Sequence, residues 1–141
     1  MKNNEEQLSL LVKKADDITC AMDMTDEIAN EMGFIDYDIL FLRLVTEEAC
    51  MNAYEYCQKT NQQGFWICWD HNQKDSLSIF IKHQGKKFMI APMTEANCGL
   101  RGRGLQLILN LMDCVQVQEN GEYVELVMRK YITQDLREGI G

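Results

Sequence analysis

Ile39-Leu-Phe-Leu-Arg-Leu-Val-Thr-Glu-Glu-Ala-Cys-Met-Asn52-Ala53 is the stretch of the chain from which the fold is most readily inferred. It predicts a helix that begins near Asp36 and continues to about Lys59. Glu48 and Asn52 are four residues apart, so a helix places them on one side, one turn from each other. The neighbouring residues are apolar enough that this side is expected to face the protein. A carboxylate and an amide are costly there unless they are paired or hold a ligand.

A second motif, Gly102-Arg103-Gly104-Leu105, stands just before an apolar helix expected over residues 105–112. Backbone N–H groups at a helix start attract anions, so these glycines are expected to offer such groups to a phosphate. Together the two motifs suggest a nucleotide pocket. Taken separately, each has a plainer interpretation: a solvated helix edge for Glu48 and Asn52, and an ordinary loop-to-helix junction for the glycines.

Composition sets the limits within which these motifs are interpreted. The 141 residues predict one domain, residues 1–141, with its core between 8 and 131. A net charge of −8 argues against direct nucleic-acid binding and against an anionic membrane surface, and makes a basic protein patch the more natural partner. No apolar run resembles a signal segment or a membrane span. Six cysteines without CxxC spacing indicate reduced thiols in a cytoplasmic protein.

The remaining sequence predicts a further helix and five strands. A helix capped by Asp16-Asp17 or Thr19 is expected to run to about Met32 and to end at Gly33. Alternating or β-branched segments predict strands. These strands are expected at residues 8–12, 65–69, 77–83, 114–118 and 123–131.

The resulting order, β-α-α-β-β-loop-α-β-β, predicts an α+β fold. We expect a two-layer α/β sandwich in which three helices cover one face of a mixed, mainly antiparallel sheet. The other face is expected to be partly exposed or dimerised, with Trp66 and Trp69 on opposite faces. The long loop 84–101 is expected to act as a lid, and residues 132–141 to form a polar tail.

This order and these motifs resemble the Bergerat-fold, or histidine kinase-like, ATPase domain, and most closely the small anti-sigma factor serine/threonine kinases of bacteria. The resemblance spans about residues 8–131. The family's N-box, Glu-x-x-x-Asn-Ala, stands here as Glu48-Ala-Cys-Met-Asn52-Ala53. Its second glycine box stands as Gly102-Arg-Gly-Leu-Gln-Leu-Ile-Leu-Asn-Leu-Met-Asp113.

The resemblance implies a role for each of these residues. Asn52 would hold Mg²⁺ against the phosphates of ATP, and Glu48 would be the general base. Nucleotide contacts are implied for His83, Gly85, Gly102, Arg103, Gly104 and Leu105. The chemistry would be phosphoryl transfer to a serine or threonine of a protein. The implied partners are a sigma factor or an anti-anti-sigma factor, and the implied assembly is a homodimer.

The first glycine box of this family reads Asp-x-Gly, and its Asp accepts a hydrogen bond from the adenine amino group. Here the box is His83-Gln84-Gly85. Strand alternation places His83 on the same face as Ile79 and Ile81, toward the helices. A neutral imidazole has one acceptor nitrogen and replaces a carboxylate only in part. Losing the charged acceptor costs about 1.5–3 kcal/mol, roughly one to two decades of affinity. Tyr56 stands where the family usually has a His.

Three hypotheses follow from these residues. The chain is a regulatory serine/threonine kinase that captures a sigma factor and phosphorylates an antagonist, or a non-catalytic module that sequesters proteins on the same fold with a degenerate ATP site. A more remote alternative is a small-molecule sensor that keeps the pocket without adenine specificity. Nucleotide binding and its dependence on Asn52 distinguish among them.

Overall fold

The computed structural model describes residues 7–85 and 99–133. Their helices and strands are, in chain order, β1 Gln7–Val12, α1 Ala15–Met32, α2 Asp36–Lys59, β2 Phe65–Asp70, β3 Ser76–Gln84, α4 Gly99–Leu111, β4 Cys114–Asn120 and β5 Tyr123–Tyr131. The predicted order is confirmed. The start of α4 differs appreciably from the prediction, and the predicted cap of α1 is wrong, because α1 begins at Ala15 and Asp16 and Asp17 lie inside its first turn. Most of the predicted lid and of the polar tail lies outside the described residues.

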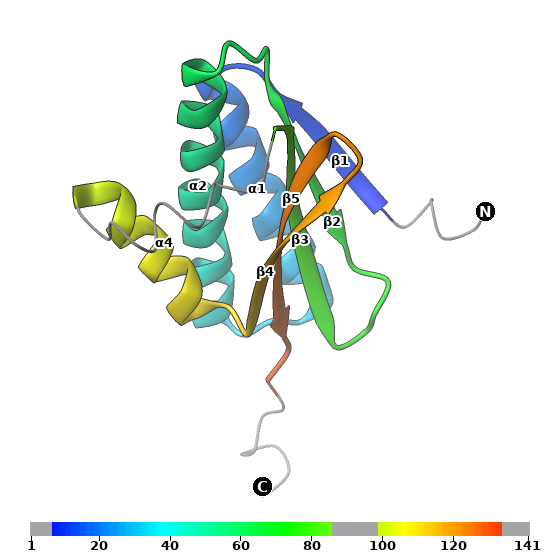
Figure 1. Ribbon diagram of the computed structural model, residues 1–141. Coiled ribbons are helices and arrows are strands. Elements are labelled where there is room, and N and C mark those ends of the chain that lie inside the picture. The colour runs from blue at the N-terminus through cyan, green and yellow to red at the C-terminus, as the bar shows by residue number, and fades with distance from the viewer. Residues whose placement is uncertain (1–6, 86–98, 134–141) are drawn as a thin grey trace, which may run out of the picture.

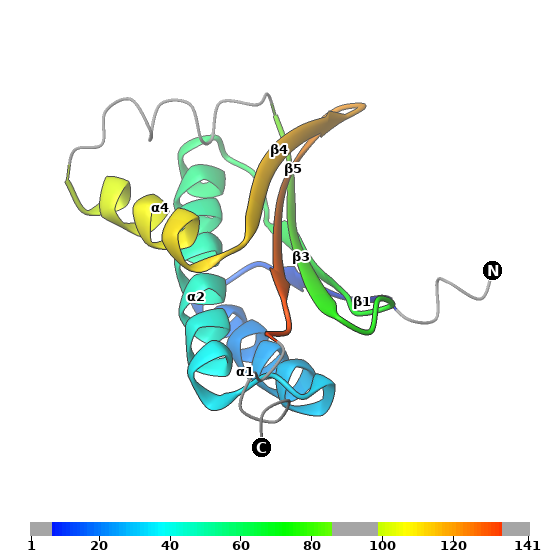
Figure 2. The ribbon, with the colours of Figure 1, turned by 90° about the horizontal axis from the view of Figure 1, so that it is seen from below.

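The five strands form one sheet with the order β1-β2-β3-β5-β4. Each neighbouring pair is antiparallel, so the sheet that was expected to be mixed is antiparallel at every described pairing. α1, α2 and α4 lie on the same face of this sheet (Figures 1 and 2). The predicted two-layer α+β architecture is therefore confirmed. An antiparallel sheet can leave its second face to solvent or to a partner.

The core lies between the sheet and the inner side of α2. Ile67 pairs with Ile81, which in turn pairs with Leu126, and all three are buried. Directly opposed residues share a face, so these side chains form one apolar row across three strands. α2 carries a complementary row of buried residues: Leu42, Val45, Ala49 and Ala53. Burial of these two rows fixes α2 over the middle of the sheet.

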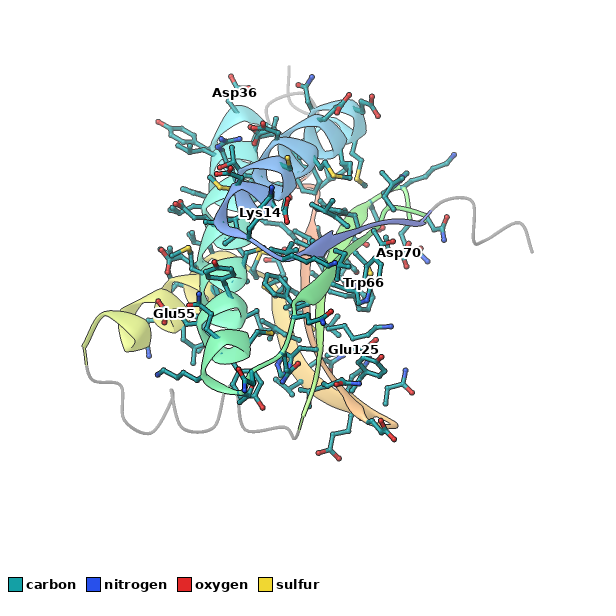
Figure 3. The ribbon with its side chains drawn as sticks, turned by 90° about the horizontal axis from the view of Figure 1, so that it is seen from above. Lys14, Asp36, Glu55, Trp66, Asp70 and Glu125 are labelled. Carbon is teal, nitrogen blue, oxygen red and sulfur yellow. The ribbon has the colours of Figure 1, made fainter. Side chains whose placement is uncertain are left out.

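The two tryptophans of β2 lie on opposite faces, as the alternation predicted. Trp69 is fully buried beneath the helices, whereas Trp66 is 40% exposed. Figure 3 shows Trp66 and Glu125 on the side of the sheet away from α2. The second face of the sheet therefore carries a large aromatic side chain that is open to solvent.

Local signals explain both ends of α1. The carboxylate of Asp17 accepts hydrogen bonds from the backbone N–H groups of Lys13 and Lys14 at 2.9 and 3.2 Å, and these bonds lower the pKa of Asp17. At the other end Gly33 has a φ of 96° and donates its N–H to Ala29 O. Glycine adopts this left-handed conformation without steric cost, so the helix ends there.

Five cysteines in the part of the chain that the structure describes are free thiols, as expected. They are Cys20, Cys50, Cys57, Cys68 and Cys114. None of the helices formed by residues 7–85 and 99–133 combines the length and the apolarity that crossing a bilayer requires.

A buried chain of hydrogen bonds connects β2, α1 and α2. Trp69 Nε1 donates to Thr25 Oγ1 at 2.9 Å, and Thr25 and Thr46 share a bond of 2.8 Å between their hydroxyl oxygens. Thr46 Oγ1 also donates to Leu42 O at 2.8 Å. Because that bond uses the hydrogen of Thr46, Thr25 is the donor in the bond between the threonines. Each hydroxyl in this chain is therefore satisfied in the core.

Replacement of Thr25 by valine is expected to lower the free energy of unfolding by about 1–3 kcal/mol, because it leaves the indole N–H of Trp69 buried without an acceptor. Urea unfolding followed by tryptophan fluorescence measures this loss. Thr19→Val, at an exposed position of the same helix, is the control and is expected to change stability by less than about 0.5 kcal/mol. Equal effects of the two substitutions would contradict the role given to the buried chain.

Candidate functional site

α2 carries the first two predicted site residues in the expected arrangement. The helix is continuous from Asp36 to Lys59, so Glu48 and Asn52 lie one turn apart on one side. Asn52 is 8% exposed, and Glu48 is half-buried. The amide therefore borders the core, while the carboxylate remains open in part to solvent.

α4 meets α2 at Glu48. Gly104 is buried, and a Cβ atom built at this glycine would overlap Glu48 Oε1. The absence of a side chain at Gly104 allows α4 to approach the carboxylate closely. The two motifs are thus brought together by the packing of α2 against α4.

The start of α4 corrects one prediction. The glycines were expected to precede the helix, but α4 begins at Gly99, so Gly102 and Gly104 lie inside its first two turns. Only the first four N–H groups of a helix lack an intrahelical acceptor, so Gly104 is not among the free donors that were expected. Glycine disfavours a helix, so residue propensity alone did not predict helical backbone at Gly102 and Gly104.

His83 lies on the helix-facing side of β3, as predicted, and is only 2% exposed. Its Nδ1 atom is 2.8 Å from Gln84 O. A carbonyl oxygen only accepts, so Nδ1 carries the hydrogen and Nε2 is left as an acceptor. Nε2 is buried and has no hydrogen-bond partner among the described residues. An orphaned buried acceptor of this kind is rare and is a candidate for contact with a ligand donor.

The environment of His83 favours its neutral form. Burial lowers the pKa of His83, and the bond to Gln84 O opposes this effect in part. The neighbouring Tyr56 and Cys57 have pKa values raised chiefly by burial, so both stay uncharged near neutral pH. The candidate acceptor is consequently an uncharged nitrogen in a weakly polar environment.

Tyr56 joins α2 to β3 at this point, a contact that the sequence analysis did not predict. Its ring centroid lies 4.5 Å from that of His83. Gly85 has a φ of 136°, and a Cβ atom there would lie 2.5 Å from the Tyr56 hydroxyl. Both the conformation and the lack of space therefore require glycine. The helical spacing of Glu48, Asn52 and Tyr56 was the signal from which this contact could have been inferred.

Glu48 has the electrostatics expected of a proton acceptor. Burial raises its pKa above 4.5, and repulsion from Glu47 and Glu55 adds to the shift. A carboxylate is a better base when its pKa is raised toward the operating pH. This property and the contact with Gly104 make Glu48 the most chemically suited residue of the candidate site.

Two further predicted residues, Leu105 and Arg103, belong to α4. Leu105 is buried and 2% exposed, so its side chain serves the core. The side chain of Arg103 lies outside the described part of the chain, and its phosphate contact stays a prediction.

One cavity of about 480 Å³ borders His83 and Gln84. Trp66, Lys82 and Tyr123 also line this cavity and place it at the open face of the sheet. Neither Glu48 nor Asn52 is among its lining residues.

The donor set fits a hard divalent cation held mainly by its ligand. Asn52 offers one amide oxygen, and Glu48 offers a carboxylate one turn away. No group of three or more His, Cys, Asp or Glu residues in the described ranges is arranged to hold a metal ion. Magnesium suits such a site, because it keeps several waters and needs few protein oxygens beside phosphates.

Comparison with known proteins yields one consistent family. Residues 11–130 match the histidine kinase-like ATPase domain. The serine-protein kinase RsbW of Bacillus subtilis (strain 168) is 27% identical over 144 aligned positions, which cover 94% of this chain and 89% of the relative. RsbW of Bacillus licheniformis is 30% identical over 119 positions, covering 77% and 74%.

A solved structure shares the fold at low sequence identity. The SiaB–SiaC complex from Pseudomonas aeruginosa contains a chain that superposes with a TM-score of 0.64 at 10% identity, with 92% of each chain covered. At this identity the likeness concerns the fold alone.

Glu48→Gln is expected to stabilise the protein near neutral pH. The folded-state pKa of Glu48 is raised, which means that the folded protein favours the protonated carboxyl. The contribution of the protonated carboxyl to stability is complete below the pKa of the unfolded chain, about 4.3, and is lost as the pH rises through the folded-state pKa. The ionised form therefore costs stability, by less than about 1 kcal/mol because the carboxylate remains partly open to solvent, which screens its charge.

The measurement is urea unfolding of wild type and Glu48→Gln across the acid to neutral range. The difference in unfolding free energy is expected to grow with pH. Glu27→Gln removes a charge from an exposed position of α1 and controls for the loss of net negative charge. A pH dependence equal to that of the control would show that burial of Glu48 has no energetic consequence.

Proposed function

Because this chain belongs to the histidine kinase-like ATPase domain family, we propose that it binds a magnesium–nucleotide complex and transfers phosphate to a serine or threonine of a protein antagonist. The observation that carries this proposal is the meeting of Glu48 and Gly104, which joins the N-box to the second glycine box. Similarity to the RsbW serine-protein kinases supports the choice of acceptor.

In this mechanism the residues of the chain position the reactants and move one proton. Asn52 supplies a neutral oxygen to the cation, which when bound neutralises phosphate charge. Glu48 accepts the proton of the attacking hydroxyl, for which its raised pKa is suited. Gly104 keeps α4 close enough to limit water around the carboxylate.

The regulatory role is proposed from the same resemblance. The chain would bind a sigma factor, and an anti-anti-sigma factor would be its antagonist and phosphate acceptor, in the cytoplasm. A homodimer formed through the open face of the sheet is part of this proposal, and the exposure of Trp66 supports it. Direct contact with nucleic acid or a membrane is not part of the role, given the net charge of −8.

A second function is a protein-sequestering module without catalysis. The specific observation in its favour is His83, whose buried imidazole replaces a charged acceptor. In that case partner binding would persist in Glu48→Ala and would be indifferent to nucleotide. In the kinase, Glu48→Ala would abolish phosphate transfer and leave nucleotide binding nearly intact.

Calorimetric titration with ATP, ADP and GTP in the presence of Mg²⁺ tests the proposal. Asn52→Ala is expected to abolish binding, because it removes the oxygen proposed for the cation. Asn30→Ala, at an exposed position of α1, is the matched control and is expected to bind as wild type does. Absence of nucleotide binding at millimolar concentrations would exclude the kinase and favour the sequestering module.

The affinity for ATP is expected to depend on pH through His83. Burial lowers the pKa of His83 below 6.5, so the imidazole is neutral in neutral and alkaline solution and ATP binding is expected to be constant there. In more acid solution Nε2 becomes protonated and donates instead of accepting, so binding is expected to weaken. His83→Asn keeps a neutral acceptor that does not titrate, and its profile is expected to lack this decline. His71→Asn, which removes the other histidine, controls for unrelated effects. A shared profile in all three proteins would assign the titration to the nucleotide itself.

A further inference from the structure

The outer side of α2 carries a row of exposed apolar residues. Tyr37 is 72% exposed and Leu40 is 57% exposed, while Phe41 and Leu44 are half-buried. Their positions follow the i, i+3, i+4, i+7 spacing, so they form one stripe on the helix. The rings of Tyr37 and Phe41 stack with centroids 6.3 Å apart and an interplanar angle of 24°. These four residues are called the α2 stripe below.

The buried core cluster does not include the four residues of this stripe. The buried residues of α2, such as Leu42, Val45 and Ala49, lie on its other side against the sheet. Single exposed apolar residues are common, but several large ones grouped on one surface mark an interaction site. Ile35, just before the helix, is also exposed, at 43%.

Negative charge is concentrated on the two helices that form this part of the molecule. Residues 15–59 contain eleven Asp and Glu residues against Arg43 and Lys59, a net charge of −9. The whole chain has a net charge of −8, so the remaining residues together are nearly neutral. Arg43 is already paired with Asp23 at 3.0 Å and with Asp26, and Lys59 is the last residue of α2. The helix that carries the stripe and the helix packed beside it are therefore strongly acidic.

We propose that the α2 stripe docks a basic amphipathic helix of a partner protein. The apolar side of that helix would cover Tyr37 and Leu40, and its Lys and Arg side chains would meet the acidic residues of α1 and α2. Asp36 stands at the start of α2 (Figure 3) and directly precedes Tyr37 in the sequence. This surface excludes Asn52 and His83, so the inference does not depend on nucleotide binding.

The charge also argues against other occupants. A second copy of the chain would bring the same acidic helices together, and like charges across an interface are unfavourable. An anionic membrane surface would be repelled for the same reason. The stripe ends at Leu44, one turn before Glu48, so a docked partner would lie beside the candidate site.

The test uses a synthetic Leu/Lys peptide with helical periodicity as the probe, and a Leu/Glu peptide of the same pattern as its control. In ¹H–¹⁵N NMR titrations of the full chain without nucleotide, the Leu/Lys peptide is expected to shift resonances of residues 35–44 most strongly. Its affinity is expected to fall as salt is raised, because charge pairs contribute to binding.

Leu40→Ser and Tyr37→Ser are each expected to weaken peptide binding about tenfold. Both side chains are exposed, so the fold should persist, and circular dichroism verifies this. Leu109→Ser alters a residue of α4 that is 40% exposed and is expected to bind as wild type does. Asp36→Lys is expected to weaken binding and to reduce its salt dependence without altering any apolar contact.

Four outcomes would overturn the inference. They are binding of the Leu/Glu peptide with equal affinity, shifts centred outside residues 35–44, unchanged affinity in both stripe variants, and a homodimer that Leu40→Ser dissociates in sedimentation equilibrium. If either serine variant unfolds, Asp36→Lys alone decides the matter, since unchanged affinity and salt dependence there would contradict the charge argument. Failure of nucleotide binding would leave all these results unaffected.

Discussion

Burial of the inner side of α2 against the sheet is the constraint on which the rest of this structure depends. The apolar rows of α2 and of β2, β3 and β5 remove each other from water and fix the helix in position and in rotation. The hydrogen bonds from Trp69 through Thr25 to Thr46 then hold α1 to the same assembly. Because the rotation of α2 is fixed by its buried side, the directions in which its remaining side chains point are fixed as well.

The candidate site is a consequence of that fixed rotation. Tyr56 packs on His83 at the end of β3, whereas Glu48 faces Gly104 of α4. Glycine stands at two close contacts, Gly104 beside Glu48 and Gly85 beside Tyr56, and a Cβ atom at either would force the polar end of an α2 side chain to move. The glycines therefore allow close approach of segments that are far apart in the sequence.

His83 gives this site an electrostatic character that differs from that of a carboxylate at the same place. A buried carboxylate would carry its charge into the core, whereas the imidazole presents a neutral acceptor whose other nitrogen is satisfied by Gln84 O. The substitution lowers the cost of burial and weakens the acceptor at the same time. Charge is also distributed unevenly over the two sides of the molecule. The helices are acidic, whereas the open face of the sheet carries the exposed Trp66, so the two surfaces suit different partners.

The sequence by itself determined the order of the elements, the face of each strand and the side of α2 that carries Glu48 and Asn52. These follow from local rules: alternation placed Ile79, Ile81 and His83 on one face, and Gly33 ended α1 by its left-handed backbone. Such rules depend only on neighbouring residues and therefore can be applied to a sequence alone.

Only the tertiary structure decided where α4 begins, that Gly104 lies against Glu48, and that Tyr56 packs on His83. The segment from Gly99 to Gly104 has the composition of a loop, yet it forms the first turns of α4. The partner of a side chain across two elements depends on how those elements pack, and no local pattern contains that information.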